Sequence, residues 1–357
     1  MSWKRIKQVF KIIEEKNLDG IFSQNPSTVQ YLTGIISNKY PPRSIYVLLT
    51  REKVYAITYP LEYEQSISES RYAEVIKIGV DEKLAEKITE IIGFPKNLGI
   101  ESNSINFDVI NSLSKKNLNI IDVTTELWEI LSVKEIEEIE KIKKAIEITE
   151  KALKVAEEMI HEGNYTEKYI AKECLITILN NDGEWFAFEP IIASGKNGAY
   201  PHASTSNEKI AKNSLTIVDI GAKFNGYCAD LTRTFANGEI DDESKRNFEI
   251  IKEAIDLAVE NIKEGVVAKD VDKIVRTYLG EKNLDKYFIH GLGHGLGLDV
   301  HEYPRLNQYS KTILKEGMIL TVEPGIYFKG KYGIRLEQDV LVKKDKCEIL
   351  SSYPLAL

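Results

Sequence analysis

Hydrophobic and polar positions divide the chain into two parts with different patterns. From residue 1 to 123, short apolar runs of strand length alternate with amphipathic stretches of helix length. This alternation predicts helices over 3–16, 28–32, 82–92 and 106–113, and strands over 20–23, 44–50, 53–58, 74–78, 98–101 and 119–123. We therefore expect an α/β domain with a mixed sheet over residues 1–124, and a linker over 125–133.

The second part, residues 134–357, begins with a different pattern. A long helix is predicted over 134–162, with Lys and Glu on its polar face and Gly163 just past its end. Thr166 is expected to cap a second helix that runs to about residue 179. Two β-branched, apolar runs follow over 215–221 and 227–235, and the Phe-Asn-Gly between them predicts a tight hairpin.

The predicted hairpin carries two acids where apolar residues are expected, Asp219 and Asp230. With Phe224-Asn225 as the loop they pair directly, and with Asn225-Gly226 as the loop they are diagonal neighbours. Both registers place them on one face, because side chains alternate along a strand. Two buried carboxylates this close repel each other, and a bound cation removes that repulsion. The alternative is a solvated hairpin edge with two surface aspartates.

An internal repeat predicts a second hairpin of the same kind. Residues 151–163 and 253–265 are identical at six of thirteen positions. The same offset, applied to the first hairpin, leads to predicted strands over 318–323 and 332–342. These strands contain Glu323 and Glu337. We expect the two hairpins to face each other across one cleft, so that four carboxylates converge and require about two divalent ions.

Three of the five histidines lie in a glycine-rich segment over 288–301, namely His290, His294 and His301. The spacing of the first two resembles that of a zinc-binding helix, but glycines at alternate positions exclude a helix. We expect instead a tight, irregular backbone packed against a site. His202 lies in a similar context, after Tyr-Pro.

Composition narrows the class of protein further. The 357 residues carry a net charge of −8 without a basic stripe, which argues against nucleic-acid binding. No apolar run is long enough to cross a membrane, and the first residues lack the core of a signal peptide. Three scattered cysteines form neither a metal-type pair nor a disulfide framework, so we expect a cytoplasmic protein.

These residues carry a resemblance to a known family. The chain resembles the Xaa-Pro dipeptidase (prolidase) and aminopeptidase P family in Leu18-Asp-Gly-Ile and in five motifs that follow in order: Val-Asp219-Ile-Gly, Ala-Asp230-Leu-Thr-Arg-Thr, Gly-His294-Gly-Leu-Gly, Thr-Val-Glu323-Pro-Gly-Ile-Tyr and Arg-Leu-Glu337-Gln-Asp. Members of that family are dinuclear metallopeptidases. The resemblance implies an α/β N-terminal (creatinase-like) domain and an α+β "pita-bread" catalytic domain over 134–357 with a pseudo-two-fold repeat.

The resemblance also implies a metal-ligand set. Asp219 would chelate one ion, Asp230 and Glu337 would bridge both, and His294 and Glu323 would complete the other site. The oxygen-rich set with one imidazole suits Mn²⁺ or Co²⁺, with Zn²⁺ as a further option. Hydrolysis would use a hydroxide that bridges the two ions, with Glu323 moving its proton to the leaving nitrogen.

Further positions match residues that surround the substrate in the family. His202 and His301 would stabilise the oxyanion as catalytic residues, and His290 would line the substrate pocket. Arg335, which we place with the substrate-binding residues, faces the same side as Glu337 and would orient the acids. Arg305 could pair with the free carboxylate of a dipeptide, or it could be an exposed surface arginine.

We therefore expect an Xaa-Pro dipeptidase that acts on small Xaa-Pro peptides, needs two divalent ions and forms a homodimer as its relatives do. The alternative in the same class is an Xaa-Pro aminopeptidase, which acts on longer peptides. A metal-free amidinohydrolase of the creatine type, or a non-catalytic binding module of the same fold, would have lost ligands that are all present here. Methionine aminopeptidase shares the ligands but lacks the α/β domain in front.

Overall fold

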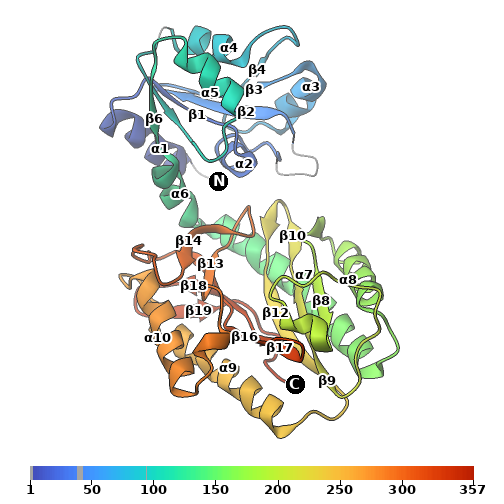
Figure 1. The fold of residues 1–357 in the computed structure, drawn as a ribbon. Helices are drawn as coiled ribbons and strands as arrows, with labels where there is room; N and C mark the ends of the chain where they lie inside the picture. Colours follow the sequence, from blue (N-terminus) through green and yellow to red (C-terminus); the bar gives the residue numbers. More distant parts are fainter. Residues whose placement is uncertain (1–2, 38–42, 94) are drawn as a thin grey trace. The chain divides into compact units, whose positions relative to one another are not determined.

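The computed structural model describes residues 3–37, 43–93 and 95–357. The chain divides into two compact units, Met1–Leu131 and Ser132–Leu357 (Figure 1). Among the described residues, no helix has the length and apolar character that a membrane-spanning segment needs.

The first unit is built on a six-stranded sheet in the order β4-β3-β2-β1-β5-β6. Strand β2 runs antiparallel to both neighbours and the remaining neighbours are parallel, which confirms the expected mixed sheet. The strands are β1 Gly20–Ser23, β2 Ile45–Thr50, β3 Val54–Thr58, β4 Glu74–Lys77, β5 Asn97–Ile100 and β6 Asn119–Asp122.

The helices of this unit are α1 Trp3–Glu15, α2 Pro26–Thr33, α3 Pro60–Glu69, α4 Leu84–Ile92, α5 Phe107–Ser114 and α6 Thr124–Ser132. Apolar side chains of α4 and α5, including Ile88 and Leu113, share one core with Phe22 and Leu48 of the sheet. Helix α3 is absent from the predicted elements, because its only buried residue is Ser66 and it therefore has no apolar stripe. Helix α6 occupies most of the segment expected to be a linker.

The second unit contains helices α7 Ile136–Glu162, α8 Glu167–Asn180, α9 Asp242–Asn261 and α10 Ala268–Glu281, with short 3-10 turns η1 Gly195–Ala199 and η2 Asp285–Tyr287. Gly163 adopts a left-handed conformation (φ 70°) and ends α7, as predicted. The Thr166 side chain accepts a hydrogen bond from the Tyr169 amide and caps α8, which was also predicted.

The strands of the second unit form small antiparallel sheets, in the orders β12-β9-β8, β11-β10-β7, β14-β13-β15-β18-β19 and β16-β17. Their bounds are β7 Trp185–Phe186, β8 Ile191–Ser194, β9 Ser214–Ile220, β10 Ala222–Phe224, β11 Tyr227–Cys228, β12 Leu231–Asn237, β13 Gly293–Gly295, β14 Glu302–Leu306, β15 Ile319–Val322, β16 Gly325–Phe328, β17 Tyr332–Arg335, β18 Gln338–Val342 and β19 Cys347–Ile349.

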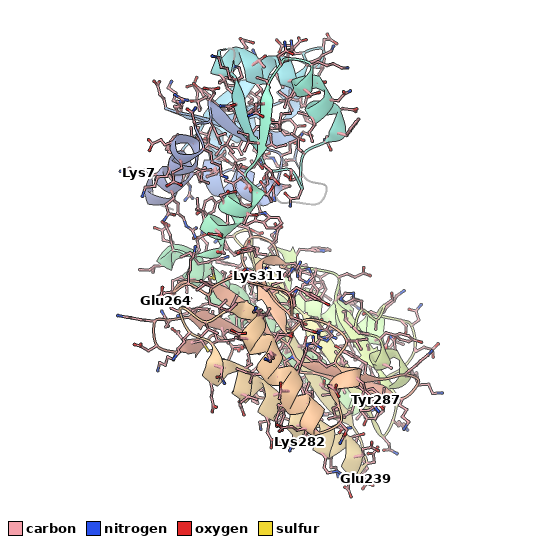
Figure 2. The ribbon with its side chains drawn as sticks, turned by 60° about the vertical axis from the view of Figure 1, so that its left-hand side comes forward. Lys7, Glu239, Glu264, Lys282, Tyr287 and Lys311 are labelled. Atoms are coloured by element: carbon pink, nitrogen blue, oxygen red, sulfur yellow. The ribbon has the colours of Figure 1, made fainter. Side chains whose placement is uncertain are left out.

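The two halves of this unit repeat one arrangement. In each half, two helices are followed by a β-ribbon, and the residue before the second helix forms a single bridge to a later segment, Thr166 with Lys209 and Val267 with Ile313. Helices α7 and α8 pack beside β8, β9 and β12, and α9 and α10 pack beside β13–β19 (Figure 1). The charged side chains of Glu239, Glu264 and Lys282 lie on the outside of this unit (Figure 2) and are exposed.

Candidate active site

The first β-ribbon places Asp219 and Asp230 on one face. Strands β9 and β12 pair Asp219 with Thr232, and β10 and β11 continue the same register to a two-residue turn at Asn225-Gly226. Both turn residues have positive φ (49° and 81°), as a type I′ hairpin requires. Of the two registers left open by the sequence, the one with Asn225-Gly226 as the loop is therefore correct, and the two aspartates are diagonal neighbours.

The second ribbon places Glu323 and Glu337 opposite each other. Strands β15 and β18 pair up to Val322 and Gln338, and β16 and β17 resume the same register at Gly325. The ladder is interrupted between them, at the two glutamates. The prediction of one strand over 332–342 was therefore wrong, because Pro324 has no N–H to return the bond that its carbonyl accepts from the Leu336 amide (3.4 Å). The Glu337 amide points away from this ribbon and donates to the Thr232 carbonyl of the first one (3.1 Å).

Two threonines of β12 join the ribbons. Thr232 donates its hydroxyl to Oε2 of Glu337 (2.8 Å), and the Thr234 hydroxyl donates to the Arg335 carbonyl (2.8 Å) while accepting from the Arg335 amide (3.1 Å). Both threonines are completely buried. The expected convergence of the acids of both hairpins therefore has a local cause, which is a seam of hydrogen bonds between β12 and the β17–β18 segment.

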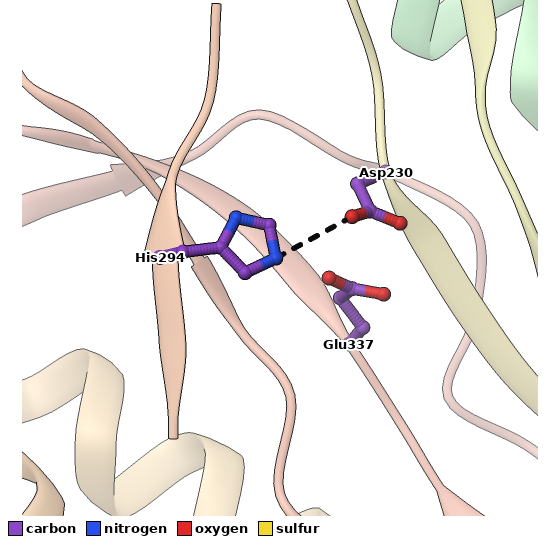
Figure 3. A group of neighbouring side chains, drawn as sticks. All are labelled: Asp230, His294 and Glu337. Carbon is purple, nitrogen blue, oxygen red and sulfur yellow. Dashed lines mark ion pairs between the residues drawn. The ribbon is translucent and has the colours of Figure 1, made fainter. Parts of the chain in front are cut away.

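His294, at the centre of β13, points into this cluster. Its Nε2 atom lies 3.4 Å from Oε1 of Glu323 and 3.6 Å from Oδ2 of Asp230. Figure 3 shows the imidazole directed at Asp230 and Glu337, and one ligand atom of each residue lies within 4.8 Å of the others. The glycines beside His294 are required, because a Cβ on Gly293 would lie 2.0 Å from the carbonyl oxygen of Thr321. This confirms the close, non-helical backbone predicted for the segment.

The pKa values of Asp230, Glu323 and Glu337 are shifted by burial and by repulsion between carboxylates, and that of His294 is shifted by burial. Burial first, and then the neighbouring carboxylates, raise the pKa values of Asp230 and Glu323 well above the ordinary range. The same causes raise the pKa of Glu337 to about 8. Burial lowers the pKa of His294 to about 3, so its imidazole is neutral and keeps a lone pair for a metal.

The donor set fits divalent cations. Oδ1 of Asp219 and Oε1 of Glu337 are buried and, within the described part of the chain, have no hydrogen-bond partner. A buried carboxylate oxygen without a donor is costly unless a cation satisfies it. Carboxylates with one neutral imidazole are ligands suited to divalent metal ions.

A cavity of about 520 Å³ opens onto the acids. It is lined by every site residue that the sequence analysis named, namely His202, Asp219, Asp230, His290, His294, His301, Arg305, Glu323, Arg335 and Glu337. His202, His301 and Arg305 are exposed to the cavity, whereas burial lowers the pKa of the enclosed His290 to about 4. The His301 ring stands edge-on to that of His294, with centroids 4.4 Å apart.

Arg335 lies between the acids and the pocket wall. Its guanidinium donates to Oδ2 of Asp219 (2.6 Å), the Tyr327 hydroxyl (2.7 Å) and the Pro201 carbonyl (3.1 Å). The side chain is buried. These bonds engage Arg335 with protein atoms, and the contact with Asp219 fixes one candidate metal ligand.

Comparison with known proteins agrees with this arrangement. Residues 140–344 match the model described as metallopeptidase family M24, and residues 5–130 match the creatinase/prolidase N-terminal domain. The chain belongs to metallopeptidase family M24. The resemblance inferred from the five motifs is thereby confirmed, as is the two-part fold that it implied.

Relatives within the M24 family match nearly the whole chain. The Xaa-Pro dipeptidase of Pyrococcus furiosus is 35% identical over 353 residues, which are 98% of this chain and 97% of that protein. The crystal structure of the prolidase from Pyrococcus horikoshii OT3 has a TM-score of 0.90 and 34% identity, covering 99% of this chain and 100% of that one. The X-Pro aminopeptidase structure from Thermotoga maritima is also similar, with a TM-score of 0.89, 31% identity and 98% coverage of both chains.

Two buried residues of this M24 site escaped the sequence analysis. The Tyr327 hydroxyl lies 3.0 Å from Nε2 of His290 and links it to Arg335. Asp339 is fully buried and accepts a bond from the Asp230 amide (3.3 Å). Tyr327 ends the motif that contains Glu323, and Asp339 ends the motif that contains Glu337. The sequence alone does not distinguish such a tyrosine from an ordinary core residue, or such an acid from an ordinary surface residue.

Proposed function

We propose that this M24 metallopeptidase is an Xaa-Pro dipeptidase, which hydrolyses the bond before a C-terminal proline in dipeptides. The observation that carries the proposal is the convergence of four acids and His294 at the base of one cavity, with two buried oxygens that lack a donor. The full-length similarity to the Xaa-Pro dipeptidase of Pyrococcus furiosus supports the choice of substrate.

The acid cluster would hold two divalent ions, Mn²⁺ or Co²⁺ in preference to Zn²⁺, through Asp219, Asp230, His294, Glu323 and Glu337. When bound, such ions polarise a carbonyl and lower the pKa of water. Support for this ligand set comes from the short distances around His294, from its neutral imidazole and from the unsatisfied oxygens of Asp219 and Glu337.

Residues of the cavity wall would act on the peptide itself. Glu323 is partly exposed to the cavity and would move a proton to the leaving nitrogen. His202 and His301 would donate to the oxygen of the scissile carbonyl as negative charge develops on it. The peptide bond before proline has no N–H. A site that acts on the carbonyl group of this bond therefore loses no hydrogen bond with such a substrate.

Arg305 would bind the free carboxylate of the dipeptide. It lines the cavity, its strand β14 pairs it with His294, and it forms no ion pair with another residue in the part of the chain that the structure describes. A guanidinium binds a carboxylate through two parallel hydrogen bonds. His290 would close the pocket beside it, oriented by Tyr327.

The test is a substrate panel on metal-stripped protein reconstituted separately with Mn²⁺, Co²⁺ and Zn²⁺. We expect cleavage of Leu-Pro, little cleavage of Leu-Ala, and slower cleavage of Leu-Pro-Gly. Cleavage restricted to Leu-Pro-Gly would support the second candidate, an Xaa-Pro aminopeptidase, which the similarity to the Thermotoga maritima enzyme favours. No cleavage of any Xaa-Pro peptide with any of the metals would contradict both.

We also propose that the protein is a cytoplasmic homodimer. The free, buried state of Cys174, Cys228 and Cys347 supports a reducing compartment, and the family resemblance supports the dimer. Light scattering coupled to size-exclusion chromatography tests the dimer, for which a mass of two chains is expected.

A further inference from the structure

Glu167, the first residue of α8, is a buried carboxylate outside the cavity. Oε1 accepts from the Ser194 amide (2.8 Å), and Oε2 accepts from the Ser206 amide (2.8 Å) and from Nδ2 of Asn197 (2.9 Å). Ser194 and Ser206 lie on either side of His202, so one carboxylate closes the base of the loop that carries this histidine.

Asp272 and Arg276 of α10 hold a second histidine loop. Asp272 is fully buried, accepts from the Leu292 amide (3.1 Å), and pairs with Nε of Arg276 (2.7 Å). The guanidinium of Arg276 then donates to the Phe288 carbonyl (2.9 Å) and to the His290 carbonyl. It also lies over the Phe288 ring, 4.3 Å from the centroid. The backbone on both sides of His290 is therefore tied to one partly buried ion pair.

The two sets of hydrogen bonds come from corresponding helices of the repeat, although Glu167 begins α8 while Asp272 and Arg276 lie further along α10. Helices α8 and α10 are each the second helix of their half, and each follows a residue that forms a single β-bridge. Glu167, Asp272 and Arg276 are all absent from the cavity lining. They therefore do not touch the substrate, and each reaches the cavity only through a loop that carries one histidine.

We propose that Glu167 is the positioning residue for His202 and that the Asp272–Arg276 pair positions His290. The proposal rests on the proposed function, because it assigns these histidines to a peptide substrate. Each set of hydrogen bonds fixes one histidine relative to the acids, and a misplacement of about 1 Å costs on the order of 100-fold in rate. Within the described residues, the loop held by Glu167 and the 288–292 segment are linked through Arg335 and Tyr327, which join the Pro201 carbonyl to Nε2 of His290. The hydrogen bonds of Glu167 and Arg276 given above go to neither Arg335 nor Tyr327, so we expect their effects to be largely separate.

Double-mutant cycles test this separation. Glu167→Gln keeps the size of the side chain but turns one acceptor into a donor, and Arg276→Lys keeps the charge next to Asp272 but loses the forked geometry. We expect each to lower kcat/KM for Leu-Pro by roughly tenfold or more. Glu167→Gln should cost nothing further when His202 is already alanine, but its effect should multiply with that of His290→Ala. Arg276→Lys should show the reverse pattern. Equal coupling to both histidines, or coupling to neither, would overturn the proposal.

Hydrogen exchange followed by mass spectrometry gives a readout that does not depend on activity. Glu167→Gln should speed exchange over 195–206 and leave 288–292 unchanged, and Arg276→Lys should do the opposite. Uniform acceleration, or none, would contradict the assignment. If the wild-type enzyme cleaves no Xaa-Pro peptide, the proposed function fails, while the exchange data still decide whether each side chain holds its own loop.

Two further variants complete the design. Glu101→Gln is the matched control, because Glu101 is a buried carboxylate in the first unit with donors from Ser23, Asn25 and Trp128. It should lower the melting temperature without changing exchange in either loop. If Glu167→Gln does not fold, Asn197→Ala removes one of the same hydrogen bonds from the other side and should reproduce the effect over 195–206.

Discussion

Loading the metal-free protein with Mn²⁺ at pH 7 should release protons from the acid cluster. The pKa values of Asp230 and Glu323 are raised well above their ordinary range, and that of Glu337 is raised to about 8, by burial and by neighbouring carboxylates. A group with a pKa of about 8 is ~90% protonated at pH 7. Metal ions bind the deprotonated carboxylate, so Glu337 gives up its proton on binding. His294 gives up none, because its pKa of about 3 leaves it neutral already.

Glu337 alone is therefore expected to release close to one proton per chain at pH 7, and the raised pKa values of Asp230 and Glu323 can only add to that number. Isothermal titration calorimetry in buffers of different ionisation enthalpy measures it, since the observed enthalpy changes with buffer enthalpy in proportion to the protons released. At pH 8.5 the number should fall by roughly half a proton or more, because Glu337 is then mostly ionised. The affinity for Mn²⁺ should weaken as the pH falls from 8 to 5. A release close to zero at pH 7 would refute the view that these acids are protonated without metal.

The same shifts give a stability test with a defined sign. A carboxyl whose folded-state pKa is raised favours the folded protein below its unfolded pKa of about 4.3. That contribution is lost as the pH rises through the folded value, which for Glu337 is about 8. The melting temperature of the metal-free protein should therefore fall between pH 5 and pH 8, and Mn²⁺ should remove most of this fall. A metal-free protein that becomes more stable over this range would contradict the reasoning.

Three further substitutions have expected outcomes. Gly293→Ala places a Cβ 2.0 Å from a backbone oxygen of β15 and should lower the free energy of unfolding by about 3 kcal/mol or more. Gly280→Ala, in helix α10, places its Cβ no closer than 3.9 Å to the nearest neighbour, Asp285, and should raise the free energy of unfolding by up to ~1 kcal/mol. Chemical denaturation measures both changes. Thr232→Val removes the hydroxyl donor to Glu337 and should weaken Mn²⁺ binding about 10- to 100-fold, as measured by calorimetry. An unchanged affinity would indicate that Glu337 is not a ligand. Arg305→Ala should raise KM for Leu-Pro about tenfold or more but leave KM for Leu-prolinamide unchanged, and equal effects on both would exclude the carboxylate contact.

The sequence predicted most of the site because its chemistry follows from strand periodicity. Alternation alone placed Asp219 and Asp230 on one face in either register, and the repeat led from them to Glu323 and Glu337. The sequence did not decide between the two hairpin registers, because the candidate loops Asn225-Gly226 and Phe224-Asn225 are shifted by a single residue. The structure decides between them, since both Asn225 and Gly226 have positive φ.

Other features depend on contacts between segments far apart in the chain. The break near Glu337 depends on the opposite strand, where Pro324 has no N–H to donate to Leu336. The partner of the Glu337 amide, the Thr232 carbonyl, lies more than a hundred residues earlier. Tyr327 likewise becomes part of the site only through the positions of His290 and Arg335. Helix α3 was missed for a local reason, since its buried side is too small to produce a periodic apolar stripe.

The alternation of hydrogen bonds along the two ribbons explains why the acids can meet. Ala229 bonds to Ala222 and Leu336 bonds to Pro324, so the next residues, Asp230 and Glu337, stand at positions whose amides point away from their partner strands. The Glu337 amide bonds to Thr232 and the Asp230 amide bonds to the side chain of Asp339, so each ribbon supplies a contact that fixes an acid of the other. The bonds of this seam from the Glu337 amide to the Thr232 carbonyl, and between the Thr234 hydroxyl and the Arg335 backbone, involve neutral groups only, so these bonds persist whether the carboxylates carry protons or metal ions. The scaffold is thus expected to be preformed in the metal-free protein, and metal binding exchanges protons for cations within a geometry that the backbone already holds.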